Sequence, residues 1–137
     1  SAEIMSSLAH DPALGHITTF GGHPVCCAAG LASLEVTVSE KLAAKALTKE
    51  QLIRDGLAEM PFREIRGEGL LLAVVPEDPA VIPAMVARAP EYGLLLDYFL
   101  FCDTAFRIAP PLTISDDEIH LACRRLKELY QAVVKRQ

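Results

Sequence analysis

The sequence has no run of basic residues and no apolar segment long enough to cross a membrane. Its 13 Lys and Arg residues against 18 Asp and Glu residues give a formal net charge of -5, which argues against nucleic acid or an anionic membrane as a partner. The apolar runs at residues 70–75 and 94–96 are far shorter than a membrane span, and the N-terminus lacks the basic and apolar parts of a signal peptide. We therefore expect a cytoplasmic protein.

Patterns for disulfide bonds and metal sites are also missing. Cys26 and Cys27 are adjacent, and the other two cysteines lie within apolar stretches, which is typical of cysteine used as a small hydrophobic residue in a reducing compartment. His10, His16 and His23 do not have the spacing of a structural zinc site. We expect neither disulfide bonds nor a bound metal.

The sequence does have enough apolar residues to build a hydrophobic core. Apolar residues make up 51% and charged residues 23% of the 137 positions, which excludes a chain kept disordered by high charge and low hydrophobicity. A chain of this length forms one domain, or one domain with an arm.

Two helices are expected after an irregular N-terminal arm. Pro24 suits the first position of a helix, and the apolar residues up to Val36 occupy nearly every face, so this helix should be buried all round. Thr37 and Glu40 have the spacing of a capping box for a second, amphipathic helix that ends at Pro61. The apolar side of that helix consists of Leu42, Ala46, Ile53 and Leu57.

Strand patterns begin in the second half of the chain. Residues 66–69 have the composition of a bend, and the continuous apolar run that follows, residues 70–75, predicts a central strand. A further helix is expected from residue 78 to about residue 89, because Asp78-Pro79 can open it and Pro90 stops it.

The last part of the chain predicts a hairpin and a final helix. Strands at residues 94–101 and 105–109 are joined through residues 102–104. Ser115 and Glu118 have capping-box spacing at the start of an amphipathic helix. The predicted fold class is α+β, with a small sheet of three or four mostly antiparallel strands covered by helices and preceded by an arm and a buried helix.

Residues 18–24, with the sequence Thr-Thr-Phe-Gly-Gly-His-Pro, form one candidate site. Thr18, Thr19 and two glycines lead directly into a helix N-terminus, where unpaired amide donors and the positive end of the helix dipole suit a phosphate. The alternative is that these residues form only a tight turn and a helix cap.

Arg107 is a second candidate, because its neighbours in the sequence are apolar. A guanidinium group in such a setting is costly unless it meets an anion, and its planar fork can hold a carboxylate through two hydrogen bonds. The alternative is that strand alternation points Arg107 into solvent while Phe106 and Ile108 point inward.

Three segments, in this order, resemble the C-terminal part of class III aminotransferases of the ornithine and acetylornithine type. They are residues 17–24 with the Ala-rich helix that follows, residues 65–71, and residues 106–114. The resemblance covers essentially the whole chain but only about the last third of such an enzyme. It implies an enzyme that moves an amino group from an amino acid to an oxoacid and uses pyridoxal 5'-phosphate.

The resemblance also implies roles for the candidate residues. Thr19, with Thr18 beside it, matches the position that donates hydrogen bonds to the cofactor phosphate across the interface of a homodimer. Arg107 matches the arginine that binds the substrate α-carboxylate. The sequence departs from the family pattern at His23, where Asn is frequent, and at Ile17, where Gly is frequent.

No catalytic residue of the family is matched in this chain. The family's Schiff-base lysine and the acidic residue that pairs with the pyridinium nitrogen belong to its upstream part. Lys41, Lys45 and Lys49 are expected on the polar surface of the second helix, so none of them matches the lysine motif. We therefore expect the chain to be inactive by itself.

The resemblance divides the chain into three parts. Residues 1–23 are the N-terminal arm and phosphate-type loop, residues 24–60 are helices linking from the large domain, and residues 61–137 are the small C-terminal α+β domain. The alternative to an aminotransferase fragment is a free-standing α+β module whose Thr-Gly loop binds some other phosphate ligand or serves an interaction.

Overall fold

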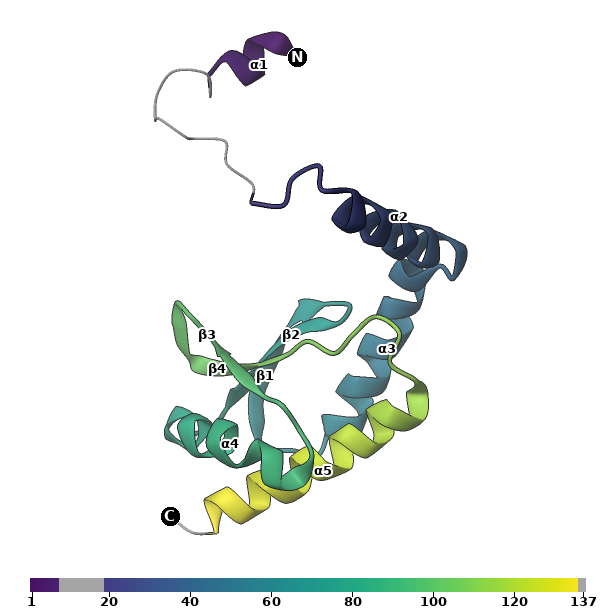
Figure 1. Ribbon diagram of the computed structural model, residues 1–137. Helices are drawn as coiled ribbons and strands as arrows, with labels where there is room; N and C mark the ends of the chain where they lie inside the picture. The colour runs from purple at the N-terminus through teal and green to yellow at the C-terminus, as the bar shows by residue number, and fades with distance from the viewer. Residues whose placement is uncertain (8–18, 136–137) are drawn as a thin grey trace. The chain divides into compact units, whose positions relative to one another are not determined.

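The chain divides into two units between residues 40 and 41. The computed structural model describes residues 1–7 and 19–135, and Figure 1 shows the elements of both units. The first unit contains the helices α1 (Ala2–Ser6) and α2 (Pro24–Ser39). The second unit contains the sheet and the other described helices, beginning with α3 (Leu42–Leu57).

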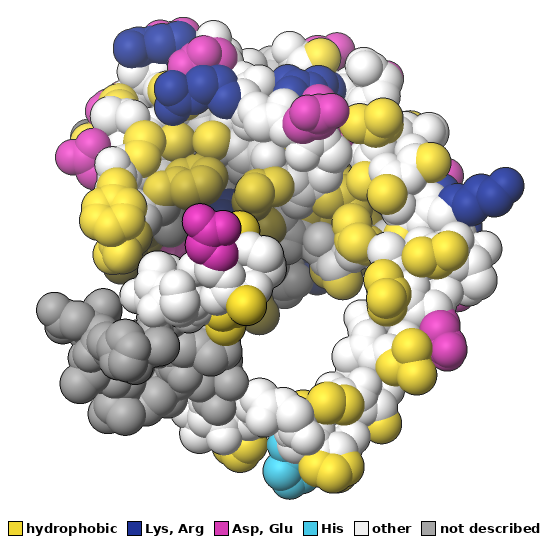
Figure 2. Space-filling model, turned by 90° about the horizontal axis from the view of Figure 1, so that it is seen from above, with side chains coloured by type: hydrophobic (Ala, Val, Ile, Leu, Met, Phe, Trp, Pro, Cys, Tyr) yellow, Lys and Arg dark blue, Asp and Glu magenta, His cyan; other side chains and the backbone are white. Residues whose placement is uncertain are grey.

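Helix α2 begins at Pro24, as the sequence predicts, but none of its residues is buried. Proline fits a first turn because the N–H that it lacks has no partner there. Val25, Leu31 and Val38 are 69%, 58% and 68% exposed, so the prediction of a helix buried all round is wrong for this chain by itself. Hydrophobic side chains are accordingly visible on the surface in Figure 2. None of the described helices is both long and apolar enough to cross a membrane.

The start of α3 also differs from the prediction. Because α2 continues through Ser39, Thr37 lies inside it, and the Thr37 hydroxyl donates to the carbonyl oxygen of Ser33 at 2.8 Å. A threonine hydroxyl readily bonds the carbonyl four residues earlier in a helix, so the predicted capping box is wrong. The N-cap of α3 is Lys41, which has a left-handed backbone with φ of 55° and makes no side-chain cap.

Four antiparallel strands form one sheet in the order β1-β2-β4-β3. The central position of β2, which covers most of the apolar run at residues 70–75, is confirmed, as is the α+β class. The strands are β1 (Phe62–Glu68), β2 (Leu71–Pro76), β3 (Asp97–Phe99) and β4 (Cys102–Ile108).

Two details of the sheet were not anticipated by the sequence. Strand β1 was missed, because it is an edge strand in which only Phe62 and Ile65 are half-buried and the other residues are exposed; edge strands carry charged residues more readily than central ones. The β3–β4 hairpin is confirmed, but its turn lies at residues 100–101 rather than 102–104.

The helices of the second unit pack on one face of the sheet (Figure 1). Leu72 and Val74 of β2 and Phe106 of β4 are fully buried and belong to the same core as the apolar sides of α3 and α5. The predicted capping box at Ser115 is confirmed. The Ser115 hydroxyl oxygen accepts from the Glu118 backbone N–H at 3.3 Å, and the Glu118 carboxylate accepts from the Ser115 N–H at 2.8 Å. The remaining elements are η1 (Pro79–Val81), α4 (Ile82–Arg88), η2 (Ala89–Tyr92) and α5 (Asp116–Val134).

Gly67, near the end of β1, is a position that tolerates no side chain. Its φ is 118°, and a Cβ atom there would overlap the carbonyl oxygen of Leu71 on the paired strand. We expect Gly67→Ala to lower the free energy of unfolding by about 2 kcal/mol, because it combines backbone strain with a steric clash. Denaturant unfolding measures this. Gly30→Ala is the matched control, since a Cβ at Gly30 meets no atom within 4 Å, and it should not lower stability. Equal unfolding free energies for wild type and Gly67→Ala would contradict the prediction.

Candidate functional site

The segment before α2 contains the first predicted site. Thr18 lies outside the described residues, whereas Thr19 is exposed and opens a turn at residues 19–22. Gly22 has φ of 77°, and no atom lies within 4 Å of the place a Cβ would take. His23 is the N-cap of α2, but its side chain makes no capping hydrogen bond.

These features suit an anion with several oxygen atoms. The first turn of α2 carries no acidic residue, so no carboxylate of that turn offsets the positive end of the helix dipole. Thr19, four residues before the N-cap His23, is exposed and its hydroxyl can donate a hydrogen bond, and Gly22 leaves open space before the helix. The donor set fits a phosphate group.

Arg107, the second predicted site, lies in β4 on the sheet face that the helices leave open. Its neighbour Phe106 pairs with Val74 and is fully buried in the core, and successive side chains of a strand point to opposite faces. The Arg107 side chain is 39% exposed. Of the two orientations that the sequence allows, the register shows that Arg107 points away from the core.

Asp97 is the ion-pair partner of Arg107. The two residues lie opposite each other in β3 and β4, and Nη2 of Arg107 donates to Oδ2 of Asp97 at 2.5 Å. A guanidinium group has five N–H donors, so this pair leaves donors for a second carboxylate. Sequence analysis missed Asp97, because recognising it requires the β3–β4 register.

A second arginine shares this face with Arg107. The register places Arg66, Ala73, Arg107 and Asp97 in one row across all four strands. The small side chain of Ala73 separates the two guanidinium groups. Arg66 pairs with Glu64 of its own strand, with Nε and Oε1 3.4 Å apart. Each arginine of the row therefore has a carboxylate partner that is about half exposed.

An apolar groove of about 340 Å³ adjoins Arg107. Arg107 is the one charged residue among the described residues that line it, which agrees with the apolar setting that the sequence predicts. The groove lies on the side of the sheet that packs against α3 and α5, whereas the guanidinium group of Arg107 points to the other face. The groove is lined mainly by residues 94–96, residues 107–111, Ile114 and the facing sides of α3 and α5.

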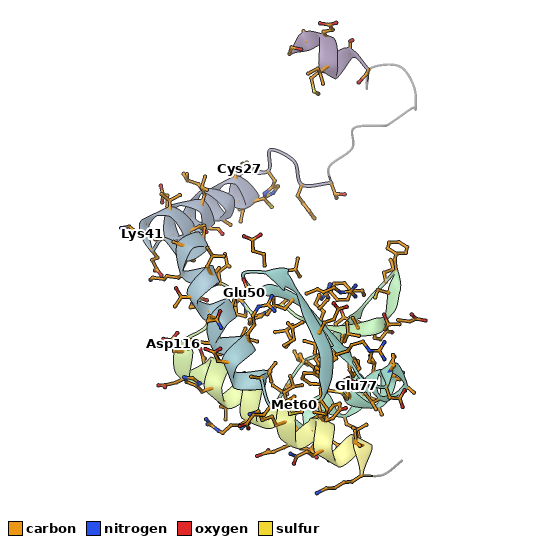
Figure 3. All side chains as sticks on the ribbon, turned by 180° about the vertical axis from the view of Figure 1, so that it is seen from behind. Cys27, Lys41, Glu50, Met60, Glu77 and Asp116 are labelled. Carbon is orange, nitrogen blue, oxygen red and sulfur yellow. The ribbon has the colours of Figure 1, made fainter. Side chains whose placement is uncertain are left out.

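A pair of charges on α3, Glu50 and Arg54, holds the β1–β2 hairpin, and Glu50 is labelled in Figure 3. Arg54 donates to the carbonyl oxygens of Ile65 and Gly67 at 2.7 and 3.1 Å. Glu50 accepts from Arg54 at 2.8 Å and from the backbone N–H of Gly69 at 2.5 Å. The hydrogen bond from Arg54, followed by that from Gly69, holds the pKa of Glu50 below its ordinary value. The spacing of Glu50 and Arg54 is visible in the sequence, but the hairpin they reach is not.

Lys49 does not lie on the polar surface of α3, so that prediction is wrong. It is only 8% exposed, and its Nζ donates to the carbonyl oxygen of Leu112 at 2.7 Å. The loop after β4 reaches α3 at this point, and the long stem of lysine lets a buried side chain deliver its charge to a polar atom. Lys41 and Lys45 are exposed, as predicted.

The cysteines form no disulfide bond and differ in their surroundings. The two in α2 are exposed, Cys102 is half-buried and Cys123 is buried. Burial raises the pKa of the Cys123 thiol, whereas the hydrogen bond with the Thr104 side chain lowers the pKa of Cys102. Among the described residues, no three His, Cys, Asp or Glu side chains are grouped to hold a metal ion; His10 and His16 lie outside those residues.

Comparison with known proteins shows similarity along nearly the whole chain. The family model described as Aminotransferase class-III matches residues 1–130. Ornithine aminotransferase 2 of Staphylococcus aureus is 32% identical over 123 residues, which cover 85% of this chain and 29% of that protein. The ornithine aminotransferase of Bacillus subtilis is 36% identical over 117 residues, which cover 83% of this chain and 28% of that protein. The chain thus spans less than a third of the length of these relatives.

The fold is similar to that of solved structures as well. A structure of the ornithine aminotransferase from Toxoplasma gondii, with partial occupancy of PLP at its active site, matches with a TM-score of 0.75 and 33% sequence identity. The match covers 98% of this chain and 32% of that one.

The Glu50–Arg54 clamp predicts a pH dependence of stability. Because the pKa of Glu50 is lower in the folded chain than in the unfolded one, the clamp stabilises the fold above the unfolded pKa, about 4.3 for glutamate, and loses this contribution as the pH falls through the lower folded value. The difference in unfolding free energy between wild type and Glu50→Gln should therefore be largest near neutral pH and shrink at acidic pH. Denaturant unfolding at several pH values measures it.

Glu59→Gln is the matched control, because Glu59 is exposed just beyond the end of α3. It should show no comparable change with pH. If Glu50→Gln were as stable as wild type at neutral pH, the Glu50–Arg54 clamp would not stabilise the hairpin.

Proposed function

The chain belongs to the class III aminotransferase family, and on that premise we propose that it is the C-terminal part of a pyridoxal-phosphate-dependent aminotransferase. The intact enzyme transfers an amino group between an amino acid and an oxoacid. The observation that carries this proposal is Arg107, which presents a partly exposed guanidinium group on the face of the sheet opposite the core. An amino acid and an oxoacid share the carboxylate that such a group binds.

In this proposal, Thr18 and Thr19 bind the phosphate of pyridoxal 5'-phosphate that is held mainly by the other subunit of a homodimer. The exposed hydroxyl of Thr19 and the first turn of α2, which carries no acidic residue, support this role. The cofactor supplies the electron sink that amino-group transfer requires, and the protein supplies position and charge.

Arg107 orients the substrate by its α-carboxylate. Asp97 holds the guanidinium group from one side through Nη2, and the remaining donors can form two parallel hydrogen bonds to a carboxylate. The guanidinium group is 39% exposed, so a substrate carboxylate can reach it from solvent. The amino group of the substrate is thereby held at a fixed distance from the arginine.

We further propose that the chain is inactive by itself, because none of its lysines matches the lysine that holds the cofactor in this family. Residues 1–23 form the arm and phosphate loop, residues 24–60 link from the large domain, and residues 61–137 form the small domain. The intact enzyme is a cytoplasmic homodimer that acts on small molecules and binds neither nucleic acid nor membranes.

The role of Thr19 is tested by removing its hydroxyl. In the intact enzyme, Thr19→Val should weaken cofactor binding about 10- to 150-fold, because a hydrogen bond to a charged group is worth roughly 1.5–3 kcal/mol. Cofactor titration followed by absorbance measures this affinity. Thr19→Ser keeps the hydroxyl and is the control, which should bind the cofactor nearly as wild type does. If Thr19→Val retained full affinity, the loop would be only a turn and a cap.

The role of Arg107 is tested by substrate kinetics. Arg107→Ala should lower kcat/KM for α-amino acids by at least about tenfold, equivalent to roughly 1.4 kcal/mol. Arg107→Lys should lose less, because it keeps the charge but not the planar fork. Cofactor affinity should change little in either variant.

Arg63→Ala is the control for this series, since Arg63 is an exposed arginine at the start of β1. It should leave kcat/KM unchanged. Substrates for the assay are ornithine, acetylornithine, lysine and 4-aminobutyrate. An Arg107→Ala enzyme with wild-type kcat/KM for every amino acid and oxoacid tested would refute the proposal for Arg107.

A further inference from the structure

Lys49 is the one charged residue that is buried in the described part of the chain. We propose that Lys49 is a positioning residue for substrate binding: it ties the loop after β4 to α3, so that Arg107 and the wall of the adjoining groove keep one geometry. This inference rests on the proposed role of Arg107. It adds a residue on another element that acts through the loop and touches no substrate.

The loop after β4 has few backbone groups with which to fix itself. Strand β4 ends at Ile108, and residues 109–115 belong to no helix or strand. Pro110 and Pro111 have no N–H, so they cannot donate to a neighbouring strand. Within the loop, the backbone N–H of Ile114 donates to the carbonyl oxygen of Pro111 at 3.0 Å. The two prolines can therefore take part in a tie to the rest of the fold only through their carbonyl groups, which leaves this loop few backbone donors.

Lys49 supplies such a tie from α3. Its Nζ donates to the carbonyl oxygen of Leu112 at 2.7 Å, five residues beyond Arg107. The hydrogen bond joins residues 63 positions apart in the sequence, and its donor is charged, which makes it stronger than a bond between neutral groups. Burying an ammonium group is costly unless it is paired in this way.

Negative charge at the start of α5 also favours the buried ammonium group. Asp116, Asp117 and Glu118 form the acidic first turn of α5, and Figure 3 shows Asp116 at the end of α5 that lies next to α3. Hydrogen bonds from Ser115 are the main cause that lowers the pKa of Glu118, and the charge of Lys49 adds to it. The Glu118 carboxylate therefore caps α5 and also attracts the positive charge of Lys49.

The loop is thus held at three places. Its start is fixed by the pairing of Ile108 with Leu72, its end by the capping box of Ser115, and its middle by Lys49. The middle includes Pro111, which lines the groove together with Arg107. Without Lys49, the groove wall beside Arg107 loses its attachment to α3, and a displacement of about 1 Å in a binding site can cost up to about 100-fold in rate.

The test compares three variants in the intact holoenzyme. Lys49→Met removes both the charge and the donor, Lys49→Arg keeps both, and Lys45→Met removes a lysine from the exposed side of the same helix. We expect Lys49→Met to raise KM for an α-amino acid and for its oxoacid about tenfold while kcat changes less than about twofold. Lys49→Arg should restore KM to within about threefold of wild type, and Lys45→Met should behave as wild type.

Hydrogen exchange followed by mass spectrometry gives a second readout. Peptides that cover residues 112–114 should exchange at least about tenfold faster in Lys49→Met, because the loop opens more often. Peptides from β2 should keep their wild-type rates. If Lys49→Met does not fold, Lys49→Gln carries the same test, since it also removes the charge and is too short to replace the hydrogen bond.

The results separate this inference from the proposed function. If Arg107→Ala lowers kcat/KM but Lys49→Met or Lys49→Gln leaves KM unchanged, Lys49 is merely structural and the inference is overturned. A Lys49 variant with lower thermal stability but unchanged KM would also show that Lys49 is merely structural. If Arg107→Ala leaves kcat/KM unchanged, the proposed function fails, and the inference fails with it.

Discussion

Side-chain alternation in β4 is the constraint on which the candidate substrate site depends. Phe106 is fully buried against the helices, so its neighbour Arg107 has to emerge on the opposite face. The pairing with β2 and β3 then surrounds Arg107 with Ala73 and Asp97. Burial of one aromatic ring thus places a guanidinium group where a ligand can reach it, and the small side chain of Ala73 leaves room beside it.

The elements that the sequence predicted well are those defined by local signals. The capping box of Ser115 and Glu118 needs only three residues of spacing, and it marks the start of α5 correctly. The apolar stripe of α3 is equally local, and its four predicted members are buried. Strand β1 was missed for the opposite reason: its charged residues are stable in a strand only because β2 lies beside it.

The candidate site shows the same division between local and long-range information. Thr19 and Arg107 could be singled out because their neighbours in the sequence are unusual for them. Asp97 and Lys49 could not. Asp97 depends on the β3–β4 register, and the turn that sets it was predicted at residues 102–104 but lies at 100–101; Lys49 depends on a carbonyl group 63 positions away. A lysine on an amphipathic helix is ordinarily a surface residue, and only the path of a distant loop made this one an interior donor.

Helix α3 holds the sheet at two places with neighbouring residues. Glu50 and Arg54 hydrogen-bond to the β1–β2 hairpin, and Lys49 hydrogen-bonds to the loop after β4. Any rotation of α3 about its axis would move both contacts together, which couples the position of the edge strand β1 to that of the loop after β4. A substitution at residue 49, 50 or 54 that shifts α3 would therefore disturb the β1–β2 turn and the loop after β4 together.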